Sequence, residues 1–244
     1  MYFIQEKFIF HPKKLPSHHE FPSNKNFEEI TVNTPDGIKL NGLLVKSDSS
    51  RGLIFFLHGS GGNISRYKNS VPIYNNLNYD IFLLDYRGYG KSEGKIKNEK
   101  QFFDDVRLAY HQMKSRYNEE NIVIIGFSLG TVPAAKIASE NNPRLLVLEA
   151  GFYNPFESAK KRVPILPVSI IMKYKFETCK YVIDTDIPIA IFHGDKDDVV
   201  DYSNAIRMKQ HLKPNDKVTI LHGEGHKDFA SCEQYIYELS ELIE

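Results

Sequence analysis

The sequence is poor in cysteine, in excess charge of either sign and in long apolar runs. Its two cysteines, Cys179 and Cys232, stand in neither a C-x-x-C pair nor a spacing typical of metal ligands. Two thiols in 244 residues fit a reducing compartment as well as they fit a single disulfide. Thirty-one basic residues balance thirty-one acidic residues, so the chain offers no basic excess that would bind nucleic acid.

No segment approaches the roughly 20 consecutive apolar residues of a membrane-spanning helix. The aromatic N-terminus, residues 1–10, is interrupted by Gln5, Glu6 and Lys7. It also lacks the basic start and the continuous apolar stretch of a secretory signal. The sequence therefore predicts a soluble, cytoplasmic protein without a transmembrane segment. Peripheral membrane contact and the oligomeric state are left open.

The composition indicates a globular α/β protein. Hydrophobic residues make up 41% of the chain and charged residues 25%, close to the globular average. Apolar runs alternate with amphipathic segments, which predicts βαβ units and a mostly parallel sheet covered by helices on both faces. The Asp36-Gly37 turn adds an antiparallel edge near the N-terminus. Residues 1–244 are expected to form a single domain.

The expected elements follow one another in a regular order. Strands are expected at residues 28–33, 38–45, 53–57, 80–84, 122–125, 145–148, 187–192 and 217–221. Helices are expected at residues 65–77 and 99–117, directly after residue 130, and at 203–212 and 229–243. Residues 11–27 are expected to form an extended lead-in.

Residues 151–186 break this pattern. The stretch contains Pro155, Pro164 and Pro167 and is too long for an ordinary connection in a compact domain. Because it lies between two sheet strands, we expect it to lie over the strand ends, where ligands bind. We interpret it as a short cap insertion, and a helical excursion packed on the body of the domain is the alternative.

A G-x-S-x-G pentapeptide stands between a predicted strand and a predicted helix at residues 126–130. In this context the motif forms a nucleophile elbow, a sharp turn that lifts the serine above the sheet edge. The turn strains the serine backbone and requires small neighbours, which Gly126 and Gly130 supply. Ser128 is therefore the candidate nucleophile, and it needs a base that a third group orients.

Four of the nine histidines directly follow predicted strands: His58, His193, His222 and His226. His226 is the candidate base, because two glycines before it let the last strand–helix loop present its side chain over the sheet edge. We interpret His222 as the residue that ends the last strand. His58 and His193 each precede a glycine and are expected to stabilise their own turns.

The acid is expected between nucleophile and base in chain order. Asp195, Asp197 and Asp198 follow the penultimate strand, and Asp197 is preferred because the turn spacing leaves it facing the next loop. Asp195 is expected to cap the turn, and Asp198 to be solvated or to cap the following helix. Glu149, at the end of the strand after the elbow, is the alternative acid.

Acyl transfer builds negative charge on a carbonyl oxygen, and N–H donors must stabilise that charge. The backbone N–H of Leu129, directly after the nucleophile, is one expected donor, and the N–H of Ser60 in the glycine-rich loop at residues 59–62 is the other. A glycine-rich loop could instead bind phosphate. Nucleotide binding is disfavoured, however, because neither G-x-G-x-x-G nor a G-K-[ST] ending follows a strand.

Five motifs together resemble those of the α/β-hydrolase family over nearly the whole chain. They are His58-Gly-Ser-Gly-Gly-Asn63, Asp85-Tyr-Arg-Gly-Tyr-Gly-Lys-Ser92, Gly126-Phe-Ser-Leu-Gly130, His193-Gly-Asp-Lys-Asp197 and Gly225-His226. Within the family, the chain is similar to small serine hydrolases related to serine aminopeptidases and to acyl-protein thioesterases of the depalmitoylase type. The resemblance again implies Asp197 as the acid. It also suggests that residues 8–12 form the lead-in of relatives with an upstream membrane anchor, which this chain is expected to lack.

The sequence thus predicts a serine hydrolase without metal or cofactor. It would cleave carboxylic ester or thioester bonds of a small-molecule or acyl substrate through an acyl-Ser128 intermediate. A serine peptidase that acts on short peptides would use the same residues and is the alternative. A non-catalytic binding protein on a hydrolase scaffold is the third hypothesis, since fold alone does not decide function.

Overall fold

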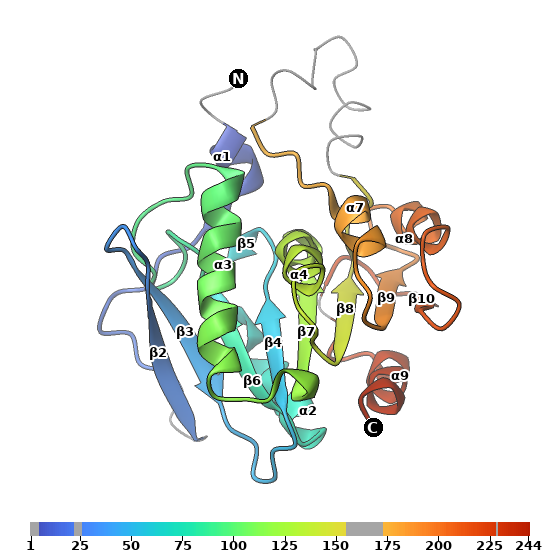
Figure 1. Cartoon of the computed structure of the whole chain (residues 1–244), viewed down its shortest axis with the longest axis horizontal. Helices are drawn as coiled ribbons and strands as arrows, with labels where there is room; N and C mark the ends of the chain where they lie inside the picture. The colour runs from blue at the N-terminus through green and yellow to red at the C-terminus, as the bar shows by residue number, and fades with distance from the viewer. Residues whose placement is uncertain (1–4, 22–25, 155–172, 228) are drawn as a thin grey trace.

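The computed structural model describes residues 5–21, 26–154, 173–227 and 229–244. An eight-stranded sheet crosses the middle of the protein (Figure 1). Its strands, in the order in which they lie side by side, are β10 (Lys217–Leu221), β9 (Ile189–Gly194), β8 (Leu145–Glu149), β7 (Ile122–Phe127), β4 (Leu53–Leu57), β6 (Asp80–Leu84), β3 (Lys39–Val45) and β2 (Phe27–Asn33).

The remaining elements connect and cover these strands. The α-helices are α1 (Gln5–Ile9), α2 (Val71–Asn76), α3 (Glu99–Lys114), α4 (Thr131–Ala138), α7 (Thr178–Ile183), α8 (Ser203–Lys209) and α9 (Glu233–Ile243). Short 3₁₀ helices are η2 (Ile64–Asn69), η3 (Glu119–Asn121) and η4 (Ser128–Gly130). A separate two-stranded sheet joins β1 (His11–Pro12) to β5 (Gly61–Gly62).

The central sheet is parallel except at its N-terminal edge. Every pairing from β10 to β6 is parallel, whereas β3 pairs antiparallel with both β6 and β2. The turn between β2 and β3 contains Gly37 at a φ of 79°, a conformation that glycine adopts without strain. The predicted mostly parallel sheet with an antiparallel edge is confirmed.

Helices cover both faces of the sheet because its central strands are apolar on both sides. Along β4, Leu53, Phe55 and Leu57 belong to a core formed with α3, α4, α7 and α8, whereas Ile54 and Phe56 belong to a core formed with η2, α2 and α9. Successive side chains of a strand point to opposite faces, so one apolar run supplies both cores. The parallel strands can then end together at one sheet edge.

Several helices are shorter than predicted. The helix predicted at residues 65–77 is divided into η2 and α2. Pro72 has no backbone N–H to continue the first helix, but it fits the first turn of a new one. The helix α3 ends at Lys114, α8 ends at Lys209, and α9 begins at Glu233, four residues later than predicted.

The N-terminal segment begins with α1, which precedes the lead-in predicted at residues 11–27. Its next residues, in β1, pair with β5 in the glycine-rich loop that follows β4. The helix α1 contacts the chain after residue 172. There the Lys173 N–H donates to Gln5 Oε1 at 2.9 Å, and the Tyr174 hydroxyl donates to Glu6 Oε1 at 2.9 Å. The segment is therefore fixed at both ends.

Half of the predicted cap at residues 151–186, namely residues 155–172, lies outside the described residues. The part that follows includes α7, whose Tyr181 and Val182 are buried in the core that also contains α4.

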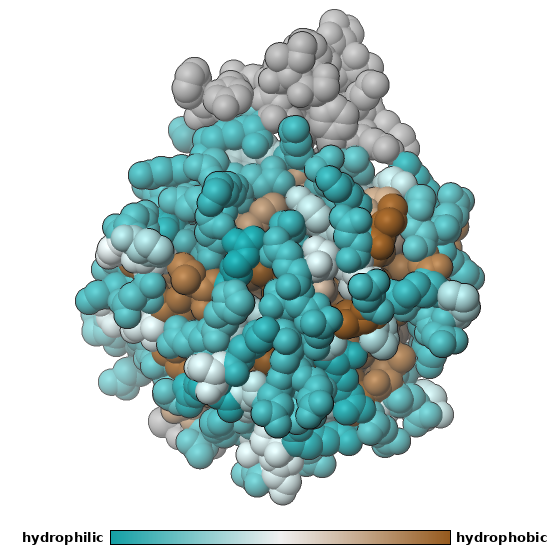
Figure 2. Space-filling model, viewed as in Figure 1, coloured by the Kyte–Doolittle hydropathy of each residue, from teal (hydrophilic) through white to brown (hydrophobic). Residues whose placement is uncertain are grey.

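The face that carries α3 and α4 is mostly hydrophilic, and its hydrophobic residues are scattered rather than gathered in one patch (Figure 2). Ion pairs lie on this surface, such as Lys100 with Asp104 at 2.6 Å and Arg107 with Glu140 at 2.9 Å. No helix in the described parts of the chain is long and apolar enough to span a bilayer.

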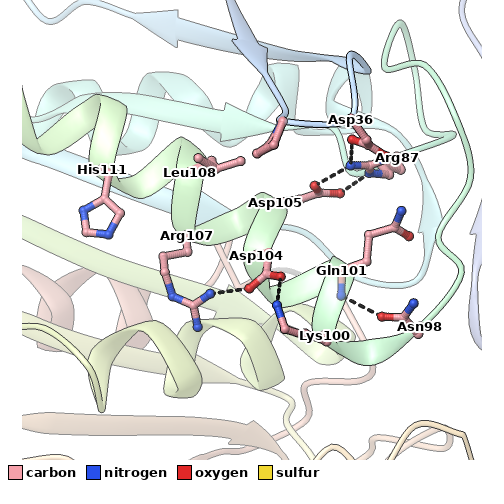
Figure 3. A pocket seen from close by; sticks show the side chains of 11 residues that line it. Asp36, Arg87, Asn98, Lys100, Gln101, Asp104, Asp105, Arg107, Leu108 and His111 are labelled. Carbon is pink, nitrogen blue, oxygen red and sulfur yellow. Dashed lines mark hydrogen bonds and ion pairs between the residues drawn. The ribbon is translucent and has the colours of Figure 1, made fainter.

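A buried arginine joins the β2–β3 turn to α3. Arg87 donates to Asp105 at 2.5 and 2.9 Å and to Asp36 at 2.7 Å twice, beside an open hollow of about 510 Å³ (Figure 3). Hydrogen bonds from Arg87 and Thr34 hold the pKa of Asp36 well below its ordinary value, whereas burial raises the pKa of Asp105. The directions differ because the Asp36 side chain is 52% exposed and that of Asp105 only 6%.

Substitution of Arg87 by alanine is expected to lower the free energy of unfolding by about 3–5 kcal/mol, because Asp105 would be left buried without its partner. Arg107→Ala is the matched control. It removes an arginine of α3 whose partners, Asp104 and Glu140, are partly exposed, so its expected loss is about 0–1 kcal/mol. Urea unfolding of both variants measures the difference. Equal losses in the free energy of unfolding would show that the buried Asp105 carboxylate does not need Arg87 as a partner for stability.

Candidate active site

Ser128 lies on a sharp turn between β7 and the helices that follow it. Its φ is 51°, in the left-handed region that side chains other than glycine rarely adopt. The turn opens directly into η4 and then α4. This is the strand–turn–helix geometry of a nucleophile elbow.

The two glycines of the pentapeptide stand where no side chain fits. A Cβ on Gly126 would lie 2.5 Å from the carbonyl oxygen of Gly130 and 2.7 Å from the Cβ of Ala134. A Cβ on Gly130 would lie 2.0 Å from the carbonyl oxygen of Leu57. The elbow can therefore fold back against the end of β4 only because both positions lack a side chain.

Three loops at one edge of the sheet bring Ser128, His226 and Asp197 together. The Nε2 of His226 lies 3.0 Å from the Ser128 Oγ, and its Nδ1 lies 2.7 Å from an Asp197 carboxylate oxygen. The three residues follow β7, β10 and β9, whose parallel pairing aligns their carboxyl ends. The His226 side chain is 15% exposed and that of Asp197 is fully buried, so this line of contacts is shielded from solvent.

The Asp197 carboxylate is held as an anion by its surroundings. Burial alone would raise its pKa, but hydrogen bonds from His193, His226 and the Val200 N–H outweigh burial and hold that pKa well below its ordinary value. One carboxylate oxygen accepts the backbone N–H groups of Val199 and Val200 at 2.9 and 2.7 Å. The other oxygen is thereby left to face His226.

His193 contacts the same carboxylate, a role that the sequence did not reveal. Its Nε2 lies 2.7 Å from the Val200 carbonyl oxygen, which can only accept, so this nitrogen carries a proton. The same nitrogen lies 3.3 Å from the Asp197 oxygen that faces His226. His193 does stabilise its own turn, as predicted, but it also adds a donor to the carboxylate. Its position four residues before Asp197, at the end of β9, is the signal that could have indicated this.

The other two candidate bases point elsewhere. His58 is 1% exposed, and its Nδ1 donates to the Gly59 carbonyl oxygen at 2.8 Å. Burial lowers the pKa of His58 to about 4, so this imidazole is neutral at pH 7. The His222 side chain is 85% exposed, and its Nδ1 lies 3.0 Å from an Asp195 carboxylate oxygen.

The two neighbouring aspartates have different surroundings. Asp195 was expected to cap its own turn, but its described contacts are with the loop after β10, where it accepts the N–H of Gly223 at 2.8 Å and lies 3.0 Å from Nδ1 of His222. Asp198 is exposed, in agreement with the first of its two expected roles, and the Ser203 N–H at the start of α8 donates to Asp201. The alternative acid, Glu149, is fully buried and accepts the Tyr235 hydroxyl.

The glycine-rich loop, residues 58–63, lies directly against the elbow. A Cβ on Gly59 would lie 3.3 Å from the Cβ of Ser128. In the described parts of the chain, the Ser60 N–H has no hydrogen-bond acceptor. The Leu129 N–H belongs to the first turn of η4 and therefore has no acceptor within its helix. Both N–H groups remain available to an external oxygen.

The hollow beside Arg87 contains none of these residues (Figure 3). Arg87 in this hollow donates to both Asp36 and Asp105. The chemistry of the candidate site therefore lies at the strand ends and not in this hollow. Among residues 5–21, 26–154, 173–227 and 229–244, no cluster of three His, Cys, Asp or Glu side chains could hold a metal ion.

A strained serine after a central parallel strand, followed in chain order by an acid and a histidine after later strands, defines the α/β-hydrolase class. Solved structures agree with this class. An esterase of Pyrococcus furiosus, Pf2001, matches with a TM-score of 0.75 at 19% identity, over 96% of this chain and 97% of that one. The acetyl xylan esterase of Paenibacillus sp. R4 matches with a TM-score of 0.72 at 16% identity, over 91% and 86% of the two chains. At these identities the likeness shows the fold alone.

Within this class, residues 48–180 match the family described as "Serine aminopeptidase, S33", and the chain belongs to that family. It is 29% identical over 204 residues to the alpha/beta hydrolase domain-containing protein 17C of Xenopus tropicalis, over 81% of this chain and 63% of that protein. The human protein 17B is 26% identical over 224 residues, over 88% of this chain and 75% of that protein. The chain thus spans less than two thirds of the length of the 17C relatives.

Proposed function

We propose that this protein is a serine hydrolase that cleaves carboxylic ester or thioester bonds through an acyl-Ser128 intermediate. The observation that carries the proposal is the line of contacts from the Ser128 hydroxyl through His226 to Asp197, at 3.0 and 2.7 Å. A serine hydroxyl is a weak nucleophile, and it becomes effective when an adjacent base, oriented by a third group, takes its proton.

In the acylation step the Ser128 oxygen attacks the substrate carbonyl carbon while its proton passes to Nε2 of His226. The imidazolium that forms is stabilised through Nδ1–H by the Asp197 carboxylate, which its low pKa keeps ionised. The tetrahedral intermediate then collapses, and His226 returns the proton to the departing alcohol or thiol. A water molecule repeats both steps on the acyl-serine and releases the acid and the free Ser128 hydroxyl.

The oxyanion of each tetrahedral intermediate would accept hydrogen bonds from the backbone N–H groups of Ser60 and Leu129. The contact of Gly59 with Ser128 supports this assignment, because it brings the glycine-rich loop against the nucleophile. Donors fixed before the reaction stabilise developing charge without reorganisation, and removal of one such donor typically lowers kcat by about 10²–10³-fold.

Family membership supports a second candidate, a peptidase that acts on short peptides with the same three residues. Ester, thioester and amide substrates that carry the same acyl group separate the two proposals. Faster turnover of the ester and thioester supports the hydrolase of the first proposal, and faster turnover of an aminoacyl amide supports the peptidase. A non-catalytic role is disfavoured, because nothing else in the described fold requires a strained serine beside a histidine.

A fluorophosphonate probe tests the proposal directly. The wild-type protein is expected to be labelled on Ser128, whereas Ser128→Ala is expected to remain unlabelled, as measured by intact mass and peptide mapping. Ser139→Ala is the matched control, because it removes the hydroxyl of a serine that donates to the Lys136 carbonyl oxygen at the end of α4, and it should be labelled like the wild type. Equal labelling of the wild type and Ser128→Ala would reject the nucleophile. No labelling, together with no turnover of p-nitrophenyl esters of increasing chain length, would favour a binding protein.

A further inference from the structure

Two tyrosines from the loop after β6 reach the carbonyl groups on either side of the Gly59–Ser60 peptide. The Tyr86 hydroxyl donates to the His58 carbonyl oxygen at 2.8 Å, and the Tyr89 hydroxyl donates to the Ser60 carbonyl oxygen at 2.7 Å. The peptide between these two anchors carries the Ser60 N–H.

The N-terminal segment reinforces the second anchor. The His11 N–H donates to the same Ser60 carbonyl oxygen at 2.9 Å, and the Lys13 N–H donates to the Gly62 carbonyl oxygen at 2.9 Å. The Asn63 side chain returns a hydrogen bond to the Lys13 carbonyl oxygen at 2.9 Å. The glycine-rich loop is therefore held from two directions, by β1 and by the tyrosines.

A loop rich in glycine needs such hydrogen bonds to hold one backbone conformation. Gly59, Gly61 and Gly62 have wide backbone freedom, so sequence alone does not fix the direction of the Ser60 N–H. Each peptide plane is rigid, and its direction is set by the two dihedrals on either side of it. With the planes before and after held by hydrogen bonds, only a concerted rotation at Gly59 and Ser60 can still turn the N–H.

Both tyrosines are themselves firmly packed. Tyr86 and Tyr89 are 1% and 0% exposed, and the Tyr86 ring lies 4.2 Å from the His58 ring between centroids. The loop that carries them is tied by Ser92, whose hydroxyl donates to the Asp85 carbonyl oxygen at 2.6 Å. Burial raises the pKa of both tyrosines, so their hydroxyls remain protonated donors.

The Asp85 side chain links the same two loops. It accepts the Ile64 N–H at 3.0 Å, directly after the glycine-rich loop. A Cβ on Gly90 would lie 1.8 Å from the Asp85 carboxylate, so the motif at residues 85–92 can close around this side chain only with glycine there. The motif, which the family resemblance singled out without a role, thus forms a rigid support for residues 58–63.

We propose that Tyr86 and Tyr89 are positioning residues that set the direction of the Ser60 N–H toward the oxyanion. The inference rests on the proposed function, because it assumes that this N–H stabilises a tetrahedral intermediate. The tyrosines do not touch the substrate. Their hydroxyls act through the backbone of residues 58–60.

Tyr89→Phe removes one hydroxyl and keeps the ring, and it is expected to lower kcat for a p-nitrophenyl ester about 10-fold, less than the loss of an entire donor. KM should change little, because the N–H matters most when the oxygen carries charge. The inhibition constant of a trifluoromethyl ketone, which forms a tetrahedral oxyanion on the serine, should rise by the same factor. Tyr86→Phe is the second variant and should act in the same direction.

Tyr79→Phe is the matched control. Tyr79 is also buried, at 1% exposure, but its hydroxyl donates to the Ile243 carbonyl oxygen in α9, away from the candidate site. Its kcat and inhibition constant should equal those of the wild type. If Tyr89→Phe and Tyr86→Phe both match Tyr79→Phe in kcat and inhibitor affinity, the positioning role is rejected. Ser128→Ala is assayed in parallel, so that failure of the positioning role can be told from failure of the proposed function. An active Ser128→Ala would reject the proposed function. An inactive Ser128→Ala beside unchanged tyrosine variants would reject the positioning role alone.

Discussion

Substitution of His226 by alanine is expected to lower kcat for ester hydrolysis by about 10⁴- to 10⁶-fold. The Nε2 of His226 is the nitrogen within 3.0 Å of the Ser128 Oγ, and in the described structure no other imidazole contacts that oxygen. Without it, the attacking hydroxyl loses its proton acceptor and the leaving group loses its proton donor. A residual rate would come from the oxyanion donors and from substrate binding. Steady-state hydrolysis of a p-nitrophenyl ester measures the loss.

The same loop provides the control for this experiment. His222 precedes His226 by four residues, is 85% exposed in its side chain, and contacts Asp195 instead of the serine. His222→Ala is therefore expected to leave kcat unchanged, although it alters the same loop and removes the same side chain. Comparable losses in both variants would indicate that the loop fold, and not proton transfer by His226, limits the rate. Full activity of His226→Ala would reject the base.

Much of the fold could be predicted because its central strands are short apolar runs. The predicted strands at residues 53–57, 80–84 and 217–221 coincide with β4, β6 and β10. The strand predicted at 187–192 begins instead at Ile189, because the preceding residue, Pro188, has no N–H to offer the sheet. Helix ends were less predictable, since they depend on local capping and on proline rather than on apolar periodicity.

The convergence of the three candidate residues was also predictable from the chain. Parallel strands end at one edge, so residues that directly follow β7, β9 and β10 meet there whatever lies between them in sequence. Glycines beside Ser128 and before His226 indicated the sharp turns that present these two side chains. Both Asp195 and Asp197 contact the loop after β10, so the choice between them depended on which histidine of that loop each side chain reaches: Asp197 contacts His226, whereas Asp195 contacts His222.

What the sequence could not predict depends on contacts between loops. The contact of His193 with Asp197 and the hydrogen bonds of Tyr86 and Tyr89 to backbone carbonyls require knowledge of where side chains point. Helical and strand periodicity describe which residues are buried, but not which carbonyl a buried hydroxyl reaches. The pairing of Arg87 with two carboxylates from distant segments is of the same kind.

Substitution of Asp197 by asparagine is expected to lower kcat by about 10⁴-fold, the size of the effect of this exchange in serine proteases. One oxygen of Asp197 accepts two backbone N–H groups, at Val199 and Val200. In the variant the amide oxygen would keep these bonds, and the amide NH₂ would face Nδ1 of His226. The imidazole would then accept at Nδ1 and carry its proton on Nε2, where it cannot take a proton from Ser128.

Asp195→Asn is the matched control, since it makes the same exchange two residues away at a carboxylate that contacts His222 and Gly223. Its kcat should stay near that of the wild type. Urea unfolding of both variants checks that the loop remains folded. A loss of less than about ten-fold in Asp197→Asn would show that His226 does not need this carboxylate for its tautomer. Glu149, which accepts the Tyr235 hydroxyl, would then have to be tested as the acid in the same way.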